Sequence, residues 1–265
     1  MTQKISFFSK KIIDHTLEFK VVGDLSSNNL SLILLHEGLG SVSMWKDVPE
    51  KIYDNTGYNV VTYSRAGYGK SSTVILPRPL DYMSIEAKKY LPEVVNQLHL
   101  KKYILIGHSD GGTIAALNSA SVQSNDLKGI VLVAPHFFIE KFNIESIKKI
   151  RNKYEKEGLR EKLSRYHDDV DNAFYGWCDT WLNPNFHSWD ITDEIQNIKK
   201  PVCAIQGNTD PYGSVKQIEV LEKKLYVNVS KLILENCGHN PFFERTEQSI
   251  KYIKSFINEI ENLKN

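Results

Sequence analysis

The feature that most constrains this chain is the stretch 103–117, which reads YILIGHSDGGTIAAL. Its apolar start predicts a buried strand, and a helical pattern begins directly after Ser109. Between them Gly107 and Gly111 flank the serine, as in a nucleophile elbow, where a Cβ on either glycine would collide with a neighbouring strand or helix. We therefore expect Ser109 to be exposed at the amino end of a helix, where unpaired N–H groups and the helix dipole favour negative charge.

Buried-strand patterns alternate with helix patterns along most of the chain. Nearly continuous apolar runs are typical of strands buried on both faces of a parallel sheet, and apolar residues at every third or fourth position are typical of helices. The first pattern predicts strands at 30–35, 58–63, 103–106, 127–134, 201–205 and 231–234, and the second predicts helices at 44–55, 84–98, 110–122, 215–225 and 247–263. This alternation predicts an α/β fold with helices on both faces of a mostly parallel sheet.

Two local features qualify this pattern. Residues 5–22 alternate loosely between apolar and polar and lead into the turn-rich segment 23–29, which predicts an antiparallel hairpin at a sheet edge. Pro92 lies inside the predicted helix 84–98, and we expect it to kink or split that helix because proline lacks an N–H donor.

Residues 137–198 form an insertion of a different kind. They contain no buried-strand pattern, only charged helical periodicities and a tryptophan-bearing run from 170 to 189. The segment is too rich in aromatic residues to be a linker. We expect a helical subdomain here, inserted into a core domain made of residues 1–136 and 199–265.

The amino-acid composition indicates in which compartment the protein works and which classes of partner it lacks. The 33 Lys and Arg residues nearly balance the 32 Asp and Glu residues, which gives no argument for a nucleic acid or an anionic membrane as partner. No run of 18 apolar residues occurs, and residues 1–11 have no apolar signal region. We therefore expect a cytoplasmic protein with no nucleic-acid or membrane partner. The sequence does not indicate an oligomeric state.

The three cysteines, Cys178, Cys203 and Cys237, have neither disulfide nor metal spacing, as expected for free thiols in a reducing compartment. Cys237 lies close to His239, but we expect a buried structural thiol because Ser109 holds the better position for a nucleophile. No histidine and aspartate cluster has zinc spacing, and no P-loop or dinucleotide fingerprint is present. We expect neither a metal nor a cofactor.

A serine nucleophile needs a base and a carboxylate that orients the base. Asp210 follows the predicted strand 201–205, and His239 follows the predicted strand 231–234. Because parallel strands end at the same edge of a sheet, both side chains should emerge where Ser109 does. Taken singly, Asp210 reads as a turn residue before proline and His239 as a capping or core histidine. Together with Ser109 they predict a catalytic triad.

The tetrahedral intermediate of acyl transfer needs N–H donors for its oxyanion. The backbone N–H of Asp110, directly after the serine, is one candidate, and the glycine-rich loop after the strand 30–35 supplies the other. There we expect the Gly38 N–H to donate, with the Leu39 N–H as the alternative.

These motifs resemble those of the α/β-hydrolase superfamily over essentially the whole chain. The matching pieces are the oxyanion loop His36–Ser41, the loop Ser64–Ser72, the elbow Gly107–Gly111, Asp210 and Gly238-His239, with the triad in the family's order. The resemblance implies that residues 137–198 are the family's helical cap, which covers the pocket and sets substrate choice. Glu37 stands where the family usually has glycine, and Ser64 where it usually has aspartate.

Five residues are candidates for the substrate pocket besides Leu39. Glu37 either contacts substrate or braces its loop through a buried pair with Arg65, and we favour the bracing role. Trp177 and Trp181 lie one helical turn apart on one face and either pack the cap onto the core or line the acyl pocket. His108 and His136 either face the cavity or are structural.

The resemblance implies a serine hydrolase that needs no cofactor and cleaves a small carboxylic ester or lactone, acyl-homoserine lactones among them, through an acyl-enzyme. A covered aromatic pocket suits an apolar acyl chain. Two alternatives remain open. The same triad can cleave a carbon–carbon bond in a dienoate or β-diketone, and a ligand receptor on this fold can keep the triad with negligible turnover.

Overall fold

The computed structural model of the protein describes residues 4–26 and 29–262. Ser27 and Asn28 of the expected turn 23–29, residues 1–3 of the amino-terminal segment, and Leu263 at the end of the expected last helix lie outside the described residues. Within the part of the chain that the structure describes, no helix is both long enough and apolar enough to span a bilayer.

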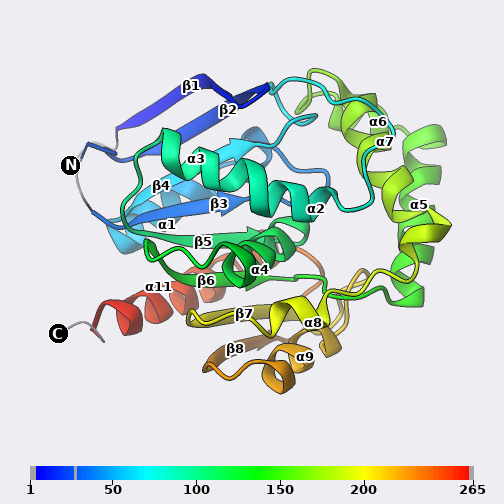
Figure 1. Ribbon diagram of the computed structural model, residues 1–265. Coiled ribbons are helices and arrows are strands. Elements are labelled where there is room, and N and C mark those ends of the chain that lie inside the picture. The colour runs from blue at the N-terminus through cyan, green and yellow to red at the C-terminus, as the bar shows by residue number, and fades with distance from the viewer. Residues whose placement is uncertain (1–3, 27–28, 263–265) are drawn as a thin grey trace.

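One sheet forms the centre of the molecule (Figure 1). Its strands are β1 (Ile5–Ile12), β2 (His15–Val22), β3 (Ser31–Leu35), β4 (Asn59–Ser64), β5 (Tyr103–His108), β6 (Leu127–Val133), β7 (Val202–Gly207) and β8 (Val229–Leu234). They lie in the order β1-β2-β4-β3-β5-β6-β7-β8. The hairpin β1–β2 pairs antiparallel with β4, and every pairing from β4 to β8 is parallel. The mostly parallel sheet with an antiparallel edge hairpin is therefore confirmed.

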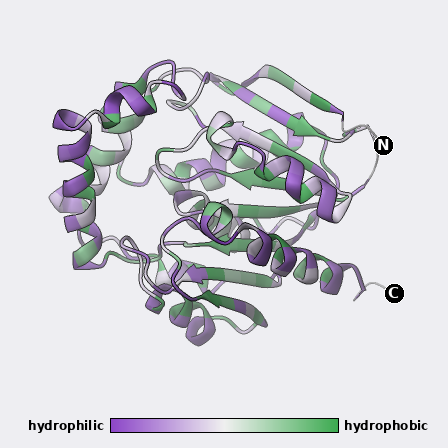
Figure 2. Cartoon of the chain, turned by 180° about the vertical axis from the view of Figure 1, so that it is seen from behind, coloured by the Kyte–Doolittle hydropathy of each residue, from purple (hydrophilic) through white to green (hydrophobic). Residues whose placement is uncertain are grey.

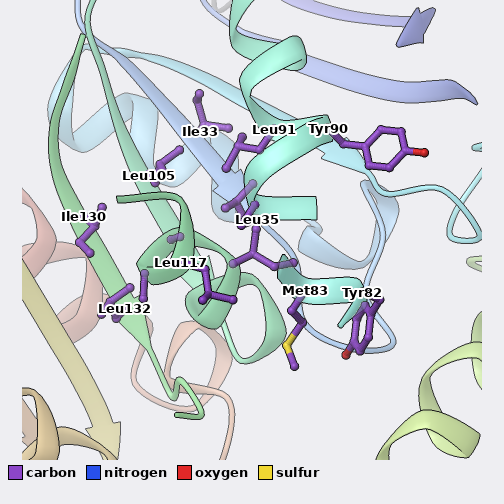
Figure 3. Packing of buried hydrophobic residues seen from close by; sticks show 14 of the residues in the cluster. Ile33, Leu35, Tyr82, Met83, Tyr90, Leu91, Leu105, Leu117, Ile130 and Leu132 are labelled. Atoms are coloured by element: carbon purple, nitrogen blue, oxygen red, sulfur yellow. The ribbon is translucent and has the colours of Figure 1, made fainter. Parts of the chain in front are cut away.

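Helices cover both faces of the sheet. On one face lie α2 (Tyr82–Ile85), the π-helical turn Glu86–Tyr90, α3 (Leu91–Gln97), α4 (Asp110–Val122), α8 (Thr192–Ile195) and α9 (Lys216–Lys224); on the other lie the 3₁₀ turn Ser43–Trp45, α1 (Val48–Thr56), α10 (Pro241–Glu244) and α11 (Thr246–Asn262). Successive residues of a strand pack on opposite faces of the sheet, because their side chains point to alternate sides. Ile33 and Leu35 belong to the cluster on the face covered by α3 and α4, where Figure 3 shows them with Leu91 and Leu117, whereas Leu32 and Leu34 belong to the cluster on the face of α1 and α11.

Two helix predictions needed correction. The expected helix 44–55 is a 3₁₀ turn followed by α1, separated at Lys46, which adopts a positive φ of 51°. The expected helix 84–98 runs from Tyr82 to Gln97, and Pro92 does not split it. Pro92 follows directly after the π-helical turn, where the N–H of Leu91 donates to the carbonyl of Glu86, so the α-helical hydrogen bonding is interrupted just before the proline while the chain stays helical.

The segment between β6 and β7 is helical and lies at the carboxyl ends of the parallel strands, away from both termini (Figure 1). It contains α5 (Lys141–Lys156), α6 (Leu159–Leu163), α7 (Val170–Trp181) and the 3₁₀ turn Pro184–Phe186, with α8 at its end. The outer surfaces of these helices are hydrophilic and the central strands hydrophobic (Figure 2). We refer to residues 137–198 as the cap.

Candidate active site

Ser109 lies in a strained turn between β5 and α4. Its φ is +53° and its ψ is −118°, a backbone conformation that residues with a side chain rarely adopt. Tight packing enforces the turn, since a Cβ on Gly107 would overlap the carbonyl of Gly111, and a Cβ on Gly111 would overlap that of Leu35. The turn therefore places the Ser109 side chain at the amino end of α4 and at the carboxyl edge of the sheet.

The structure brings Ser109, His239 and Asp210 into one hydrogen-bonded chain. His239 Nδ1 lies 2.7 Å from Asp210 Oδ2, and His239 Nε2 lies 2.9 Å from Ser109 Oγ. Because an ionised carboxylate only accepts, Nδ1–H donates to Asp210, which leaves the Nε2 lone pair to accept from the serine hydroxyl. This is the geometry in which a histidine withdraws a proton from serine.

Asp210 is held as an ionised acceptor. Its Oδ1 accepts from the N–H of Tyr212 at 2.7 Å, and its Oδ2 accepts from Gln206 Nε2 at 2.8 Å as well as from His239. Burial by itself would raise the pKa of the Asp210 carboxyl, but the charge and hydrogen bond of His239 and the Tyr212 N–H hold it below its ordinary value. The carboxylate is thus fixed in position and charge.

Glu37 is placed differently from the expected pair with Arg65, so that prediction was wrong. The Arg65 guanidinium does brace the loop, but it donates to the backbone carbonyls of His36 and Glu37. The Glu37 carboxylate instead lies 3.6 Å from His108 Nδ1. His108 Nε2–H donates to the carbonyl of His239 at 2.7 Å. A carboxylate beside the oxyanion loop is thereby linked through His108 to the backbone of His239.

The pKa values of this pair move in opposite directions. Burial would lower the pKa of His108, but the hydrogen bond and charge of Glu37 raise it above its ordinary value. Burial would raise the pKa of Glu37, but His108 lowers it below its ordinary value. Both shifts favour a charged pair of imidazolium and carboxylate.

The second departure from the family pattern, Ser64, also has a structural explanation. Ser64 Oγ donates to Glu18 Oε2 at 2.8 Å, and the same carboxylate oxygen accepts from the N–H of Lys70 at 3.0 Å. Ser64 Oγ in turn accepts from the N–H of Val42 at 2.9 Å. The carboxylate that the sequence lacks at position 64 is therefore supplied to this loop by Glu18 of β2.

The expected oxyanion donors are unpaired. The N–H groups of Gly38, Leu39 and Asp110 donate to no residue within the ranges 4–26 and 29–262. Gly38 lies directly against the indole nitrogen edge of Trp177, where a Cβ would overlap the ring. The loop after β3 and helix α7 of the cap are thus in close contact beside Ser109.

A cavity of about 210 Å³ lies between the core and the cap, next to Ser109 and His239. Five of the candidate pocket residues are among those that line it: Glu37, Leu39, His136, Trp177 and Trp181. His108 is not among the lining residues, so of the two alternatives left open for it the structural one applies. The His108 ring lies beneath the site, packed against Trp45 and Phe242 and bonded to the backbone of His239.

His136 is a neutral residue of the cavity wall. Its ring lies edge-on against Trp181 with centroids 5.2 Å apart, and 5.7 Å from the ring of His239. Burial and the nearby His239 lower the pKa of His136 to about 3. Cys237 is also no rival to Ser109, because it is buried and burial raises the pKa of its thiol to about 11.

Sequence reasoning missed seven residues that line the cavity: Met44, Asn143, Ile147, Ile150, Leu159, Leu163 and Tyr212. A signal for Asn143 was present, because it continues the apolar face of α5 that carries Ile147 and Ile150 at helical spacing, and a polar residue there is unusual. Tyr212 could have been found from its position two residues after Asp210; its ring centroid lies 4.8 Å from that of His239.

A serine, a histidine and an aspartate in a hydrogen-bonded chain at the carboxyl edge of such a sheet, beneath a helical cap, define the class of α/β hydrolases. Residues 31–184, more than half of the chain, match the family model of the alpha/beta hydrolase fold. The chain belongs to this family.

Individual relatives cover nearly the full length. A proline iminopeptidase of Lactobacillus helveticus is 23% identical over 91% of this chain and 94% of its own length. Among solved structures, an enol-lactonase from Burkholderia xenovorans superimposes with a TM-score of 0.74 at 15% identity, covering 94% of this chain and 99% of its own. A thermophilic esterase from Thermogutta terrifontis has a TM-score of 0.74 at 16% identity, with 96% and 99% covered. The two structures support the fold.

Proposed function

We propose that the protein is a serine hydrolase that cleaves small carboxylic esters or lactones, acyl-homoserine lactones among them, through an acyl-enzyme. The observation that carries this proposal is the hydrogen-bonded chain from Ser109 through His239 to Asp210, which opens into a mostly apolar cavity. The solved esterase and lactonase structures of the same fold are consistent with it.

The proposed reaction uses side chains and backbone amides. Ser109 Oγ attacks the substrate carbonyl while its proton passes to His239 Nε2. The tetrahedral intermediate collapses when that proton reaches the leaving alcohol oxygen, and Ser109 keeps the acyl group. Water then attacks the acyl-enzyme with His239 again as the base. Asp210 fixes the histidine tautomer and stabilises the imidazolium in both halves.

Two N–H groups are proposed to hold the oxyanion, those of Gly38 and Asp110. Both are free of protein acceptors in the described part of the chain, and Asp110 begins helix α4, whose dipole favours negative charge. One such donor is typically worth about 3–4 kcal/mol in the transition state.

The size and lining of the cavity favour small acyl groups. Its volume of about 210 Å³ is below the roughly 300–1,000 Å³ usual for drug-sized ligands. Aliphatic and aromatic side chains of the cap form most of the wall: Ile147, Ile150, Leu159, Leu163, Trp177 and Trp181. Esters with short chains should fit best.

A second candidate is hydrolysis of an amide at the amino end of a peptide. It is favoured by one observation, the similarity to proline iminopeptidases over most of both chains. The same three residues would act, with the amine as leaving group. Comparing proline p-nitroanilide with short p-nitrophenyl esters separates the two candidates.

The primary test combines mass spectrometry with kinetics. A fluorophosphonate probe should add once to the wild type, and Ser109→Ala should lose both the adduct and hydrolysis of p-nitrophenyl acetate through decanoate, by about 10³-fold or more. Ser119→Ala is the matched control, because its hydroxyl is buried on the same helix and has no partner in the structure. It should keep the adduct and the activity.

No adduct on the wild type would contradict an activated serine, and tight ligand capture without product would then support a receptor. Slow ester turnover beside fast cleavage of a β-diketone would favour the carbon–carbon hydrolase.

A further inference from the structure

Two residues that line the catalytic cavity each carry a buried side-chain oxygen that has no hydrogen-bond partner within residues 4–26 and 29–262. Asp110 Oδ1 and Asn143 Oδ1 are both unpartnered, although their residues are 0% and 2% exposed. Buried acceptors are nearly always satisfied by protein, water or a bound ligand, because leaving them unsatisfied is costly. Because both residues line the cavity, a substrate bound there is a candidate partner for these oxygens.

The oxygen of Asn143 is fixed in orientation. Asn143 Nδ2 donates to the carbonyl of Tyr212 at 2.8 Å, and the Asn143 N–H donates to the carbonyl of Glu140 at 3.0 Å. Turning the amide over would place its oxygen against the Tyr212 carbonyl and lose that hydrogen bond. Asn143 Oδ1 therefore remains an unused acceptor on a residue of the cavity wall.

The oxygen of Asp110 is held by a second chain of contacts. Asp110 Oδ2 accepts from the Tyr82 hydroxyl, and that hydroxyl accepts from Trp181 Nε1 at 3.1 Å. These contacts occupy one carboxyl oxygen and leave Oδ1 unpartnered. Burial raises the pKa of the Asp110 carboxyl, although the charge of Arg65 opposes this shift. The amide of Asn143 does not titrate, so its oxygen can accept a hydrogen bond at any pH.

We propose that the enzyme prefers substrates with a hydroxyl group on the acyl chain, close to the scissile carbonyl. This hydroxyl donates a hydrogen bond to Asn143 Oδ1, and Asp110 Oδ1 is a second acceptor. The side chains next to Asn143 on the cap, Ile147 and Ile150, offer no competing polar group. The inference names a substrate class for the proposed ester hydrolase and rests on that function.

The test compares pairs of esters. The values of kcat/KM are measured for p-nitrophenyl butyrate and for its 2-hydroxy and 3-hydroxy derivatives, each divided by the rate of hydroxide-catalysed hydrolysis to remove intrinsic reactivity. The better hydroxy ester should exceed butyrate by about tenfold in the wild type, as expected for one hydrogen bond made in a buried site. In Asn143→Leu, which has a similar shape, the ratio should fall to about one.

Asn118→Leu is the matched control. Asn118 is also 2% exposed, its Nδ2 donates to the carbonyl of Ala87 at 2.8 Å, and its Oδ1 is unpartnered, but it does not line the cavity. It should keep the wild-type ratio. Asn143→Ala removes the same oxygen with a smaller side chain and should also lower the ratio to about one, which covers the case in which the leucine variant fails to fold.

A wild-type ratio near one would overturn the proposal, as would a ratio that survives in Asn143→Leu. Either result leaves the hydrolase function intact if butyrate is cleaved in a Ser109-dependent way. Absence of Ser109-dependent cleavage for all three esters would instead overturn the proposed function, and this inference with it.

Discussion

Glu37 and His108 form the unusual part of the site at the scale of single residues. Glu37 immediately precedes Gly38, a proposed oxyanion donor, and His108 immediately precedes Ser109. The pair therefore connects the loop after β3 with the elbow, and the hydrogen bond from His108 to the His239 carbonyl extends the connection to the loop after β8. Three loops that must keep their relative positions are joined by one charged contact and one hydrogen bond.

We predict that Glu37→Gln destabilises the protein in a pH-dependent way. The His108 pKa is raised and the Glu37 pKa is lowered, so the pair contributes fully between their ordinary values of 4.5 and 6.5. The contribution is lost as pH rises through the folded pKa of His108, and also as pH falls through that of Glu37. We expect a loss of about 1–2 kcal/mol in the free energy of unfolding near pH 5.5, which shrinks as the pH rises above the ordinary histidine value of 6.5.

Urea denaturation of both proteins over this pH range measures the difference. Glu50→Gln is the control, because the carboxylate of Glu50 pairs with a lysine, Lys20, at 2.6 Å. This pair contains no histidine, so the effect of Glu50→Gln should stay constant over the range. A Glu37→Gln effect that is equally constant would show that His108 carries no charge in the pair.

At the scale of elements, the cap is tied to the core by a histidine. His167 precedes α7, and its Nδ1 accepts from the N–H of Gly69 at 2.9 Å. The proton must then be on Nε2, which donates to the carbonyl of Leu39 at 3.0 Å. One buried ring thus links the cap to the loops that follow β3 and β4.

His167→Ala should loosen the cap while leaving the sheet intact. Loss of two buried hydrogen bonds should speed amide exchange in α7 by about tenfold or more, with no change in β5 and β6. Hydrogen–deuterium exchange with peptide-level mass spectrometry measures this. His187→Ala replaces an exposed histidine of the same cap and should change nothing. Equal exchange in α7 of His167→Ala and the wild type would mean that apolar packing alone holds the cap.

His167 also makes the attachment of the cap to the core depend on pH. Burial lowers the pKa of His167, so the folded state favours the neutral ring. Its stabilising contribution is full above the ordinary histidine pKa and is lost as pH falls below it, because protonation removes the acceptor for Gly69.

At the scale of the whole molecule, cap and core share one hydrophobic cluster. Leu35 and Leu105 of the sheet belong to the same buried cluster as Ile147 and Trp177 of the cap. The two ends of the cap are also paired, since the N–H of Ile191 donates to the carbonyl of Phe137 at 2.8 Å. Burying one cluster from two segments couples their stability.

We therefore predict that cap and core unfold together. Three of the four tryptophans lie in the cap, at positions 177, 181 and 189, so fluorescence reports mainly on the cap and far-ultraviolet circular dichroism on the whole chain. The two urea transitions should have the same midpoint, and Trp45→Phe, which removes the tryptophan of the core, should leave them coincident. A fluorescence midpoint at clearly lower urea would indicate that the cap unfolds independently.

Patterns that depend on neighbours in sequence were predicted well. The six parallel strands and the edge hairpin follow from apolar runs and turn residues, and the elbow at Ser109 follows from glycines two positions away on either side. Where local rules compete, the prediction failed. Pro92 predicted a kink or split in the helix 84–98, whereas the chain stays helical from Tyr82 to Gln97 with a π-helical turn directly before α3.

The sequence by itself determined the fold class and the three residues that the structure joins by hydrogen bonds, because strand polarity places the ends of parallel strands at one edge. Only the tertiary structure decided the partner of the Glu37 carboxylate and the lining of the cavity. His108 and His239 are separated by 131 positions in the chain, and Asn143 reaches the cavity only because α5 packs over the sheet. Such contacts depend on how distant segments pack, and no local pattern encodes that packing.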